Sequence, residues 1–198
     1  MLQDQEFFLR LGRAVEFRDT ERGVHIQRLA RYARLIAENL GLSDAEQNAI
    51  LQAAPLHDLG KITTPDAILF KPGRLTAEEF EVMKKHARAG FDILRHGDSE
   101  VLRLAAVIAL SHHEKFDGTG YPNGLAGEAI PLCGRIVAVA DAFDALTSER
   151  PYKRAWDRPH AVEILRHSRG SHFDARCVDA FLRDLDAVRA IGECFPGE

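Results

Sequence analysis

Apolar residues recur at helical spacing along most of the chain. Between residues 24 and 40 they follow steps of three and four positions, and Gly41 ends the run. At residues 43–46 and 76–79 a serine or threonine is followed three positions later by glutamate, which is the pattern of a capped helix start. Alternation of apolar and polar residues, which is typical of a strand, persists nowhere over a useful length. The sequence therefore predicts an all-α fold.

Further helices are expected in the second half of the chain. Asp98 is expected to cap a helix over residues 101–111, and Asp174 a helix over residues 177–190. Between residues 131 and 147 the apolar positions are so dense that a largely buried helix is predicted.

Two segments interrupt the helical pattern. Residues 63–73 are predicted to form a loop with a short apolar patch. Residues 116–127 contain four glycines and one proline, too many helix breakers for a helix. A loop of about a dozen residues is long enough to carry function.

Length and composition predict one globular domain over residues 1–198. The chain has 198 residues, of which 45% are hydrophobic and 28% charged, so a core forms without disulfides. Cys133, Cys177 and Cys194 lie far apart and form no Cys-x-x-Cys pair. They are expected to be reduced thiols that pack as small apolar residues.

The charge and the apolar stretches exclude two classes of partner. A net charge of −4 does not provide the basic surface that long nucleic acids require. The longest apolar stretches are too short and too charged to span a bilayer. The chain opens with a charged amphipathic segment rather than a signal peptide, so a cytoplasmic location is expected.

Several of the nine histidines stand beside carboxylates near predicted helix ends. Glu21 and His25 are four positions apart and therefore share one helix face. His57 and Asp58 end an apolar helix, and both can serve one centre only if it lies beside that end. The two oxygens of Asp58 can bridge two metal ions.

The remaining candidates lie within apolar helices or at their ends. His86 falls within a predicted helix, whereas His112 and His113 close an apolar helix and lead into the glycine-rich segment. Asp141 has apolar neighbours, among which a carboxylate is costly unless it is paired or binds a cation.

Together these residues indicate a metal centre with nitrogen and oxygen ligands. Such a ligand set suits Fe, Mn, Co, Ni or Zn. Glu21, Asp58 and Asp141 bring three negative charges, whereas two or three divalent ions bring four or six positive ones. The centre is therefore expected to stay net positive and to favour an anionic substrate.

Three strings of residues resemble the signature of a known family. Residues 57–61, His-Asp-Leu-Gly-Lys, resemble the HD superfamily of metal-dependent phosphohydrolases. Residues 112–122 and 141–153 resemble the extended signature of one branch, the HD-GYP phosphodiesterases. The resemblance covers residues 18–173.

This resemblance implies a helical bundle of the HD type, with the glycine-rich GYP loop near a centre of two or three metals. It implies hydrolysis of cyclic di-GMP, a bacterial second messenger, to linear pGpG or GMP by a hydroxide that bridges two metals. Fe or Mn are favoured as the metals, with Co, Ni or Zn as alternatives. The implied ligands are Glu21, which is associated with a third metal, His25, His57, Asp58, His86, His112, His113 and Asp141.

Further residues are expected to act on the substrate. Asp58 and Lys61 are the expected catalytic residues, since Lys61 follows one helical turn after Asp58 and can reach a phosphate oxygen. Arg150 and Lys153 are expected to complete an anionic clamp. Tyr121 is expected to hydrogen-bond phosphate or to stack on guanine.

Two other functions stay open on sequence alone. The same metals can act on another cyclic dinucleotide, such as cyclic GMP-AMP, because residues that contact the bases lie outside the motifs. Alternatively, the chain is a catalytically weak module that senses the nucleotide or docks a protein partner through residues 118–127. Domains of this family are usually joined to a receiver or sensory module, which is a second expected partner.

Overall fold

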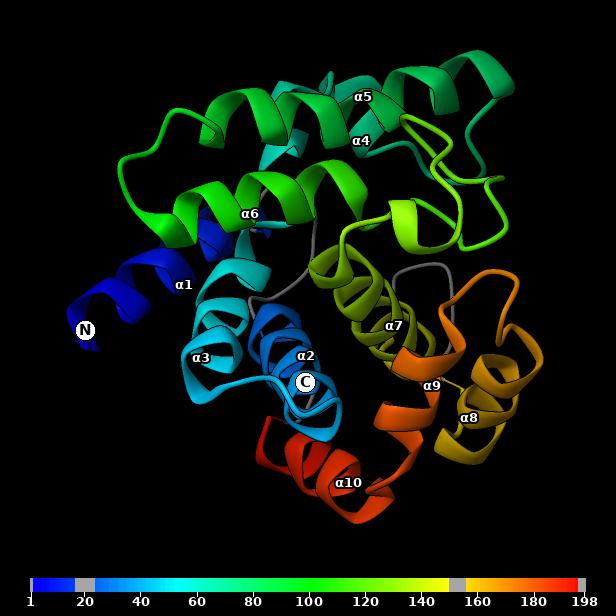
Figure 1. Ribbon diagram of the computed structural model, residues 1–198. Helices are drawn as coiled ribbons and strands as arrows, with labels where there is room; N and C mark the ends of the chain where they lie inside the picture. Colours follow the sequence, from blue (N-terminus) through cyan, green and yellow to red (C-terminus); the bar gives the residue numbers. More distant parts are fainter. Residues whose placement is uncertain (1, 17–23, 150–155, 196–198) are drawn as a thin grey trace.

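The structure is a computed structural model that describes residues 2–16, 24–149 and 156–195 (Figure 1). Its α-helices are α1 (Leu2–Glu16), α2 (His25–Asn39), α3 (Asp44–Ala53), α4 (Asp66–Leu69), α5 (Ala77–Leu94), α6 (Glu100–Ser111), α7 (Leu132–Thr147), α8 (Arg158–His167), α9 (Ala175–Leu182) and α10 (Leu185–Cys194). Its 3-10 helices are η1 (Ala54–Leu56), η2 (Leu59–Thr63) and η3 (Gly127–Ala129). The described ranges contain isolated β-bridges but no strand, so the predicted all-α fold is confirmed.

Helices α2 and α7 form the centre of the molecule. They pack against each other, with α3 against α2 and α6 against both α3 and α7. Their apolar side chains are fully buried, as at Leu29 and Ile36 of α2 and at Val139 of α7. Helices α5 and α6 lie side by side at one end of the bundle, and α8, α9 and α10 lie toward the other (Figure 1). The buried helix predicted over residues 131–147 is thus confirmed.

Side-chain caps begin α3 and α5 as predicted. At α3, the Ser43 side chain accepts from the backbone N–H of Glu46, and the Glu46 carboxylate accepts from the backbone N–H of Ser43. Thr76 and Glu79 form the same reciprocal pair at α5. Gly41, just after α2, has φ of 81°, a value that glycine adopts without a steric penalty.

Two local expectations in the first two-thirds of the chain are wrong. Asp98 does not cap α6, because the side chain of Ser99 accepts the backbone N–H of Val101 at 3.2 Å. Residues 63–73 are not only a loop, since they contain the four-residue helix α4. The carbonyl of Pro65 accepts the first hydrogen bonds of that helix.

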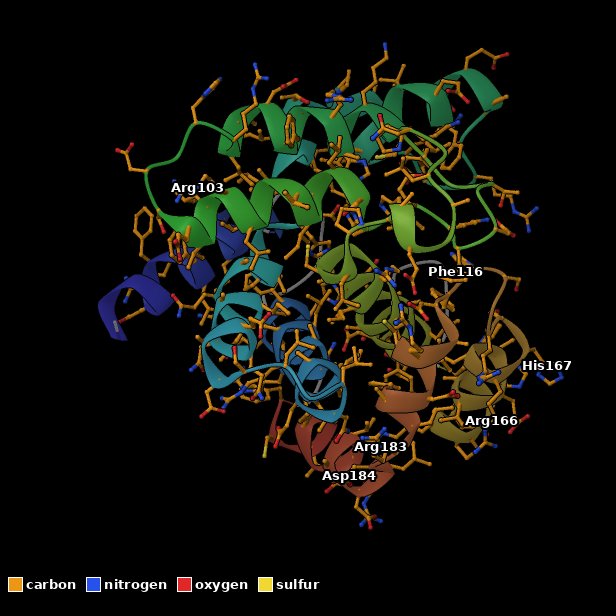
Figure 2. The ribbon with its side chains drawn as sticks, viewed as in Figure 1. Arg103, Phe116, Arg166, His167, Arg183 and Asp184 are labelled. Atoms are coloured by element: carbon orange, nitrogen blue, oxygen red, sulfur yellow. The ribbon has the colours of Figure 1, made fainter. Side chains whose placement is uncertain are left out.

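The single helix expected over residues 177–190 is two helices. Asp174 caps α9, but α9 ends before Asp184, whose side chain accepts the backbone N–H of Ala187 at 2.8 Å and begins α10. An aspartate that binds nearby backbone N–H groups favours a new helix start over continuation. Figure 2 shows Asp184 at this joint, beside Arg183.

Hydrogen bonds hold the glycine-rich segment in place. The buried Glu114 carboxylate accepts the backbone N–H groups of Asn123 at 2.8 Å and Leu125 at 3.0 Å. The backbone N–H of Asp117 donates to the carbonyl of Ser171 at 2.8 Å. The segment is therefore attached both to the end of α6 and to the connection between α8 and α9.

Polar and charged side chains project from the outer faces of the helices. Arg103 of α6 and Arg166 and His167 of α8 are examples (Figure 2). Among the residues that the structure describes, none of the helices has the length and apolar character needed to cross a membrane.

Candidate metal centre

The adjacent residues His57 and Asp58 lie at a joint between two 3-10 helices. His57 follows η1, and Asp58 precedes η2 with φ of −100° and ψ of 11°. This change of direction turns both side chains toward one region. Gly60 lets η2 approach α5, because a Cβ at this position would lie 1.9 Å from the carbonyl oxygen of His86. The glycine of the His-Asp-Leu-Gly-Lys string thus allows the segment that carries Asp58 to approach the helix that carries His86.

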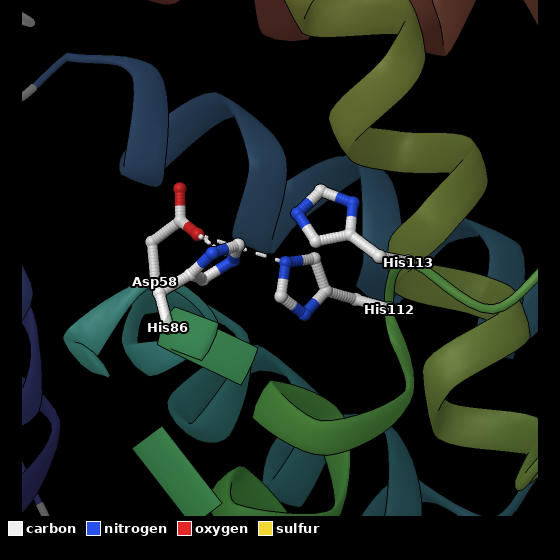
Figure 3. A group of neighbouring side chains, drawn as sticks. All are labelled: Asp58, His86, His112 and His113. Atoms are coloured by element: carbon white, nitrogen blue, oxygen red, sulfur yellow. Dashed lines mark ion pairs between the residues drawn. The ribbon is translucent and has the colours of Figure 1, made fainter. Parts of the chain in front are cut away.

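The other described candidate ligands come from four helices. His25 begins α2, His86 lies in α5, His112 caps the end of α6 with His113 next to it, and Asp141 lies in α7. Their potential ligand atoms fall into two groups, each of which brings atoms from different elements within 4.8 Å of one another. Figure 3 shows three of the histidines around the carboxylate of the His-Asp pair.

The first cluster consists of Asp58, His86, His112 and His113. One potential ligand atom from each residue lies within 4.8 Å of the others. Asp58 Oδ1 is 3.2 Å from His86 Nε2 and 3.6 Å from His112 Nε2 (Figure 3). This arrangement can hold one metal ion with three nitrogen ligands and one oxygen ligand.

The second cluster consists of His25, His57 and Asp141. Asp141 Oδ1 is 3.6 Å from His25 Nε2 and 4.0 Å from His57 Nε2. Asp58 joins the two clusters, because its other oxygen, Oδ2, is 3.3 Å from His57 Nε2. The same oxygen accepts the ammonium of Lys61 at 2.8 Å. One carboxylate thus presents one oxygen to each cluster.

Backbone carbonyls fix the ring orientation of three histidines. They lie at hydrogen-bonding distance from Nδ1 of His57 (3.0 Å), His86 (2.7 Å) and His112 (3.1 Å). Because a carbonyl oxygen only accepts, Nδ1 carries the proton, and the lone pair of each ring is on Nε2. All three Nε2 atoms face the clusters. This is the orientation that a metal-binding imidazole needs.

Some polar atoms of this region are buried without a hydrogen-bond partner among the described residues. They are His57 Nε2, Asp58 Oδ1, His86 Nε2 and His112 Nε2. Each such atom costs about 1–3 kcal/mol when it stays unsatisfied. Divalent metals accept electron pairs from imidazole nitrogen and carboxylate oxygen, so they satisfy all of these atoms together. The residues present therefore fit a divalent metal centre.

The protonation states also suit metal binding. Burial alone would raise the pKa of Asp58, but the Lys61 ammonium holds that pKa well below its usual range. Burial, together with the neighbouring imidazoles, lowers the pKa of His113 well below its usual range. The carboxylate is therefore ionised and this imidazole neutral at pH 7, as metal ligands must be.

A buried carboxylate behind the second cluster holds His25. Asp144 Oδ2 is 2.5 Å from His25 Nδ1, and the carboxylate also accepts two hydrogen bonds from the Arg28 guanidinium and one from the Ser148 hydroxyl. Burial alone would raise the pKa of Asp144, but the hydrogen bonds from Arg28 and His25 lower it to about 2. An ionised Asp144 therefore directs His25 Nε2 toward Asp141.

Sequence reasoning missed Asp144 and Arg28. The available signal was their spacing, because Asp144 follows Asp141 by three positions and Arg28 follows His25 by three. Residues three apart share a helix face, so each partner pair extends the same face of its helix.

The remaining predicted site residues divide into two groups. The ring of Tyr121 stacks on His113 with 4.7 Å between centroids and 30° between planes, which places it beside the first cluster. Glu21, Arg150 and Lys153 lie outside the described residues.

Comparison with known proteins assigns the class of this helical metal-binding fold. A family model described as HD domain matches residues 11–177. The chain therefore belongs to the HD domain family, whose members bind divalent metals. The resemblance drawn from the His-Asp-Leu-Gly-Lys string is confirmed, including its HD-GYP branch.

Curated relatives are similar over most of this chain. The cyclic di-GMP phosphodiesterase response regulator RpfG of Xanthomonas campestris is 52% identical over 181 residues, 91% of this chain and 48% of the relative. A cyclic di-GMP phosphodiesterase of Thermotoga maritima is 48% identical over 85% of this chain and 46% of its own length. The 3′3′-cGAMP-specific phosphodiesterase 2 of Vibrio cholerae is 43% identical over 97% of this chain and 37% of its own. The chain thus spans about half the length of these relatives or less.

Solved structures share the fold. A cyclic GMP-AMP specific phosphodiesterase of V. cholerae, V-cGAP3, has a TM-score of 0.70 at 21% identity. The match covers 95% of this chain and 50% of that protein's chain. The HD domain of the L. monocytogenes phosphodiesterase PgpH, in complex with cyclic di-AMP, has a TM-score of 0.60 at 15% identity over 96% of this chain and 98% of its own. At these identities the likeness establishes the HD fold.

Proposed function

We propose that this chain is a metal-dependent phosphodiesterase that hydrolyses cyclic di-GMP. The observation that carries the proposal is the Asp58 carboxylate, which presents one oxygen to each of two histidine clusters. In these clusters the Nε2 atoms of His57, His86 and His112 are buried and have no hydrogen-bond partner among the described residues. Relatives named cyclic di-GMP phosphodiesterases, 48–52% identical to this chain, support the choice of substrate.

Each residue of the centre has a defined task in this proposal. Divalent metals held by the two clusters would supply a water of lowered pKa as nucleophile and would neutralise the charge of the phosphodiester. Asp58 fixes the spacing of the clusters. The Lys61 ammonium, 2.8 Å from Asp58 Oδ2, is placed to bind a nonbridging phosphate oxygen at the edge of the centre.

The finer assignments belong to the same proposal. We assign the metals as Fe or Mn, with Co, Ni or Zn also compatible with nitrogen and oxygen ligands. Glu21 is proposed to bring a third metal and with it cleavage through to GMP, and Arg150 and Lys153 to bind phosphate. One domain over residues 1–198, a cytoplasmic location and a protein partner at residues 118–127 stay predictions.

Turnover assays on anaerobically purified protein test the proposal. Metal-loaded wild type should convert cyclic di-GMP to pGpG or GMP in chromatography of the products. His86→Ala should lose a metal and nearly all turnover, whereas His96→Ala, an exposed histidine just beyond the same helix, should retain both.

The same assay separates the alternative functions. Faster turnover of 3′3′-cGAMP than of cyclic di-GMP would make 3′3′-cGAMP the preferred substrate. This comparison is included because the V. cholerae relative that is 43% identical is named for that substrate. Full metal loading with nucleotide binding and no hydrolysis would assign a binding module instead.

A further inference from the structure

A row of aromatic rings leads from the first cluster to the surface. Tyr121 stacks on His113, and the ring of Phe80 in α5 meets Tyr121 edge to face, with 6.0 Å between centroids. Phe80 is 45% exposed, so its ring contributes little to the core. Phe80 thus presents an exposed aromatic ring that adjoins Tyr121, which itself stacks on a residue of the first cluster.

A cation lies over this row. Lys84 follows Phe80 by one helical turn, and its Nζ is 5.3 Å from the Phe80 centroid and 5.7 Å from the Tyr121 centroid. It also forms an ion pair with Glu81 at 2.5 Å, which limits how far the ammonium moves. Phe80, Lys84 and Tyr121 together are called the aromatic shelf below.

We propose that the aromatic shelf binds a guanine base of the substrate, with the base stacked on Phe80 and its acceptor edge on Lys84. This inference rests on the proposed function and deepens it. A cyclic dinucleotide carries two flat bases beside its phosphates, so a phosphate at the clusters brings a base to the rim of the centre. Exposed aromatic rings bind bases through their faces whatever the sequence.

Lys84 gives the shelf a preference for guanine over adenine. Guanine presents two acceptors, O6 and N7, on one edge, whereas adenine presents N7 beside an amino donor. An ammonium only donates, so it pairs with both guanine atoms and is opposed by the amino group of adenine. The shelf therefore discriminates cyclic di-GMP from cyclic di-AMP.

The first test measures kcat, KM and the dissociation constant for cyclic di-GMP in Phe80→Ala. KM and the dissociation constant should rise about 10-fold, as expected for the loss of one stacked base, while metal content stays at the wild-type value. Phe80→Trp should restore wild-type affinity, because tryptophan also offers a flat face. Ile93→Ala, an equally exposed apolar residue of α5, should change neither constant.

The second test compares substrates in Lys84→Met, with the exposed neighbour Lys85→Met as the matched control. The ratio of kcat/KM for cyclic di-GMP to that for cyclic di-AMP should fall about 10-fold in Lys84→Met alone. An unchanged ratio would overturn the assignment of Lys84.

The outcomes distinguish this inference from the proposed function. Wild-type hydrolysis with unchanged KM in Phe80→Ala would overturn the shelf and leave the phosphodiesterase in place. Wild type that binds cyclic di-GMP without hydrolysing it would overturn the phosphodiesterase, and weaker binding by Phe80→Ala would still support the shelf.

Discussion

Two buried polar regions of this molecule differ in how their polar atoms are satisfied. Asp174 accepts from the Arg135 guanidinium at 2.6 Å and from the backbone N–H of Arg176 at 2.8 Å, and Arg135 also donates to the carbonyl of Ile130 at 2.9 Å. Around Asp58, by contrast, buried ring nitrogens and a carboxylate oxygen lack a hydrogen-bond partner among the described residues.

This difference separates a structural ion pair from a binding centre. A buried polar group with partners contributes to a unique fold, whereas one without partners costs stability. The unsatisfied atoms around Asp58 therefore lower the stability of the metal-free chain and favour the binding of metal. Asp144 combines both properties, because it pairs with Arg28 and also holds the metal-facing His25.

The largest effect is expected for Asp58→Asn. The variant loses the charged bridge between the clusters, so turnover of cyclic di-GMP should fall at least about 1000-fold at saturating metal. The metal-free variant should lose less stability than a fully partnered buried carboxylate would, because one oxygen of Asp58 pairs with Lys61 while the other has no hydrogen-bond partner among the described residues. Wild-type turnover by the variant would show that Asp58 does not bridge metals.

The opposite result is expected for Asp174→Asn, which should lose stability and keep its metal and its activity. Removing the charge leaves Arg135 buried without its counter-ion, so the free energy of unfolding should fall by about 3 kcal/mol. Metal content and kcat should match wild type. Loss of metal at unchanged stability would contradict the division into two regions.

The stability that the Asp174–Arg135 ion pair contributes depends on pH in a predictable direction. Burial alone would raise the pKa of Asp174, but the Arg176 N–H and the Arg135 guanidinium lower it below its ordinary value of 3.8. Its stabilisation is therefore complete above that value and is lost as the pH falls through the lower folded pKa. In urea unfolding, the gap between wild type and Asp174→Asn should be constant from pH 7 to about 5 and should shrink below about 4.

An intermediate effect is expected for Asp144→Asn. The neutral side chain holds His25 less firmly, so metal affinity at the second cluster should fall about 10- to 100-fold in a chelator competition. Ser148→Ala removes one hydrogen bond to the same carboxylate and one from Arg28, but it leaves the Asp144 charge in place and should cost less than 10-fold. Equal losses in both variants would exclude a special role for the Asp144 charge.

The smallest effect is expected for Glu114→Gln. Each oxygen of the carboxylate accepts one backbone N–H of the glycine-rich segment, so the glutamine amide keeps one of these bonds and loses the other, at a cost of about 1–2 kcal/mol. Hydrogen exchange at Asn123 and Leu125 should become several-fold faster, while metal content is unchanged. Unaltered exchange would show that other contacts order the segment.

Much of the fold and centre followed from the sequence because the signals are local. Capping residues at 43 and 76 and the helical period of the apolar positions depend on neighbours within one or two turns. The His-Asp pair and the His-His pair were found because their motifs are contiguous in the sequence.

The missed features depend on contacts between distant segments. Asp144 acquires its role only when α7 packs against α2 and brings it to His25. Phe80 lies in α5, and only the folded glycine-rich segment places Tyr121 beside it. The division of residues 177–190 was missed because Asp184 was not recognised as a cap.

Metal analysis and product chromatography on one anaerobically purified sample decide whether this chain is a metal-dependent phosphodiesterase. We expect two or three Fe or Mn ions per chain, with pGpG or GMP formed from cyclic di-GMP. Removal of the metals by a chelator should abolish turnover and leave the chain helical. A folded chain that retains less than one metal, or one that is fully loaded and hydrolyses no cyclic dinucleotide, would contradict it.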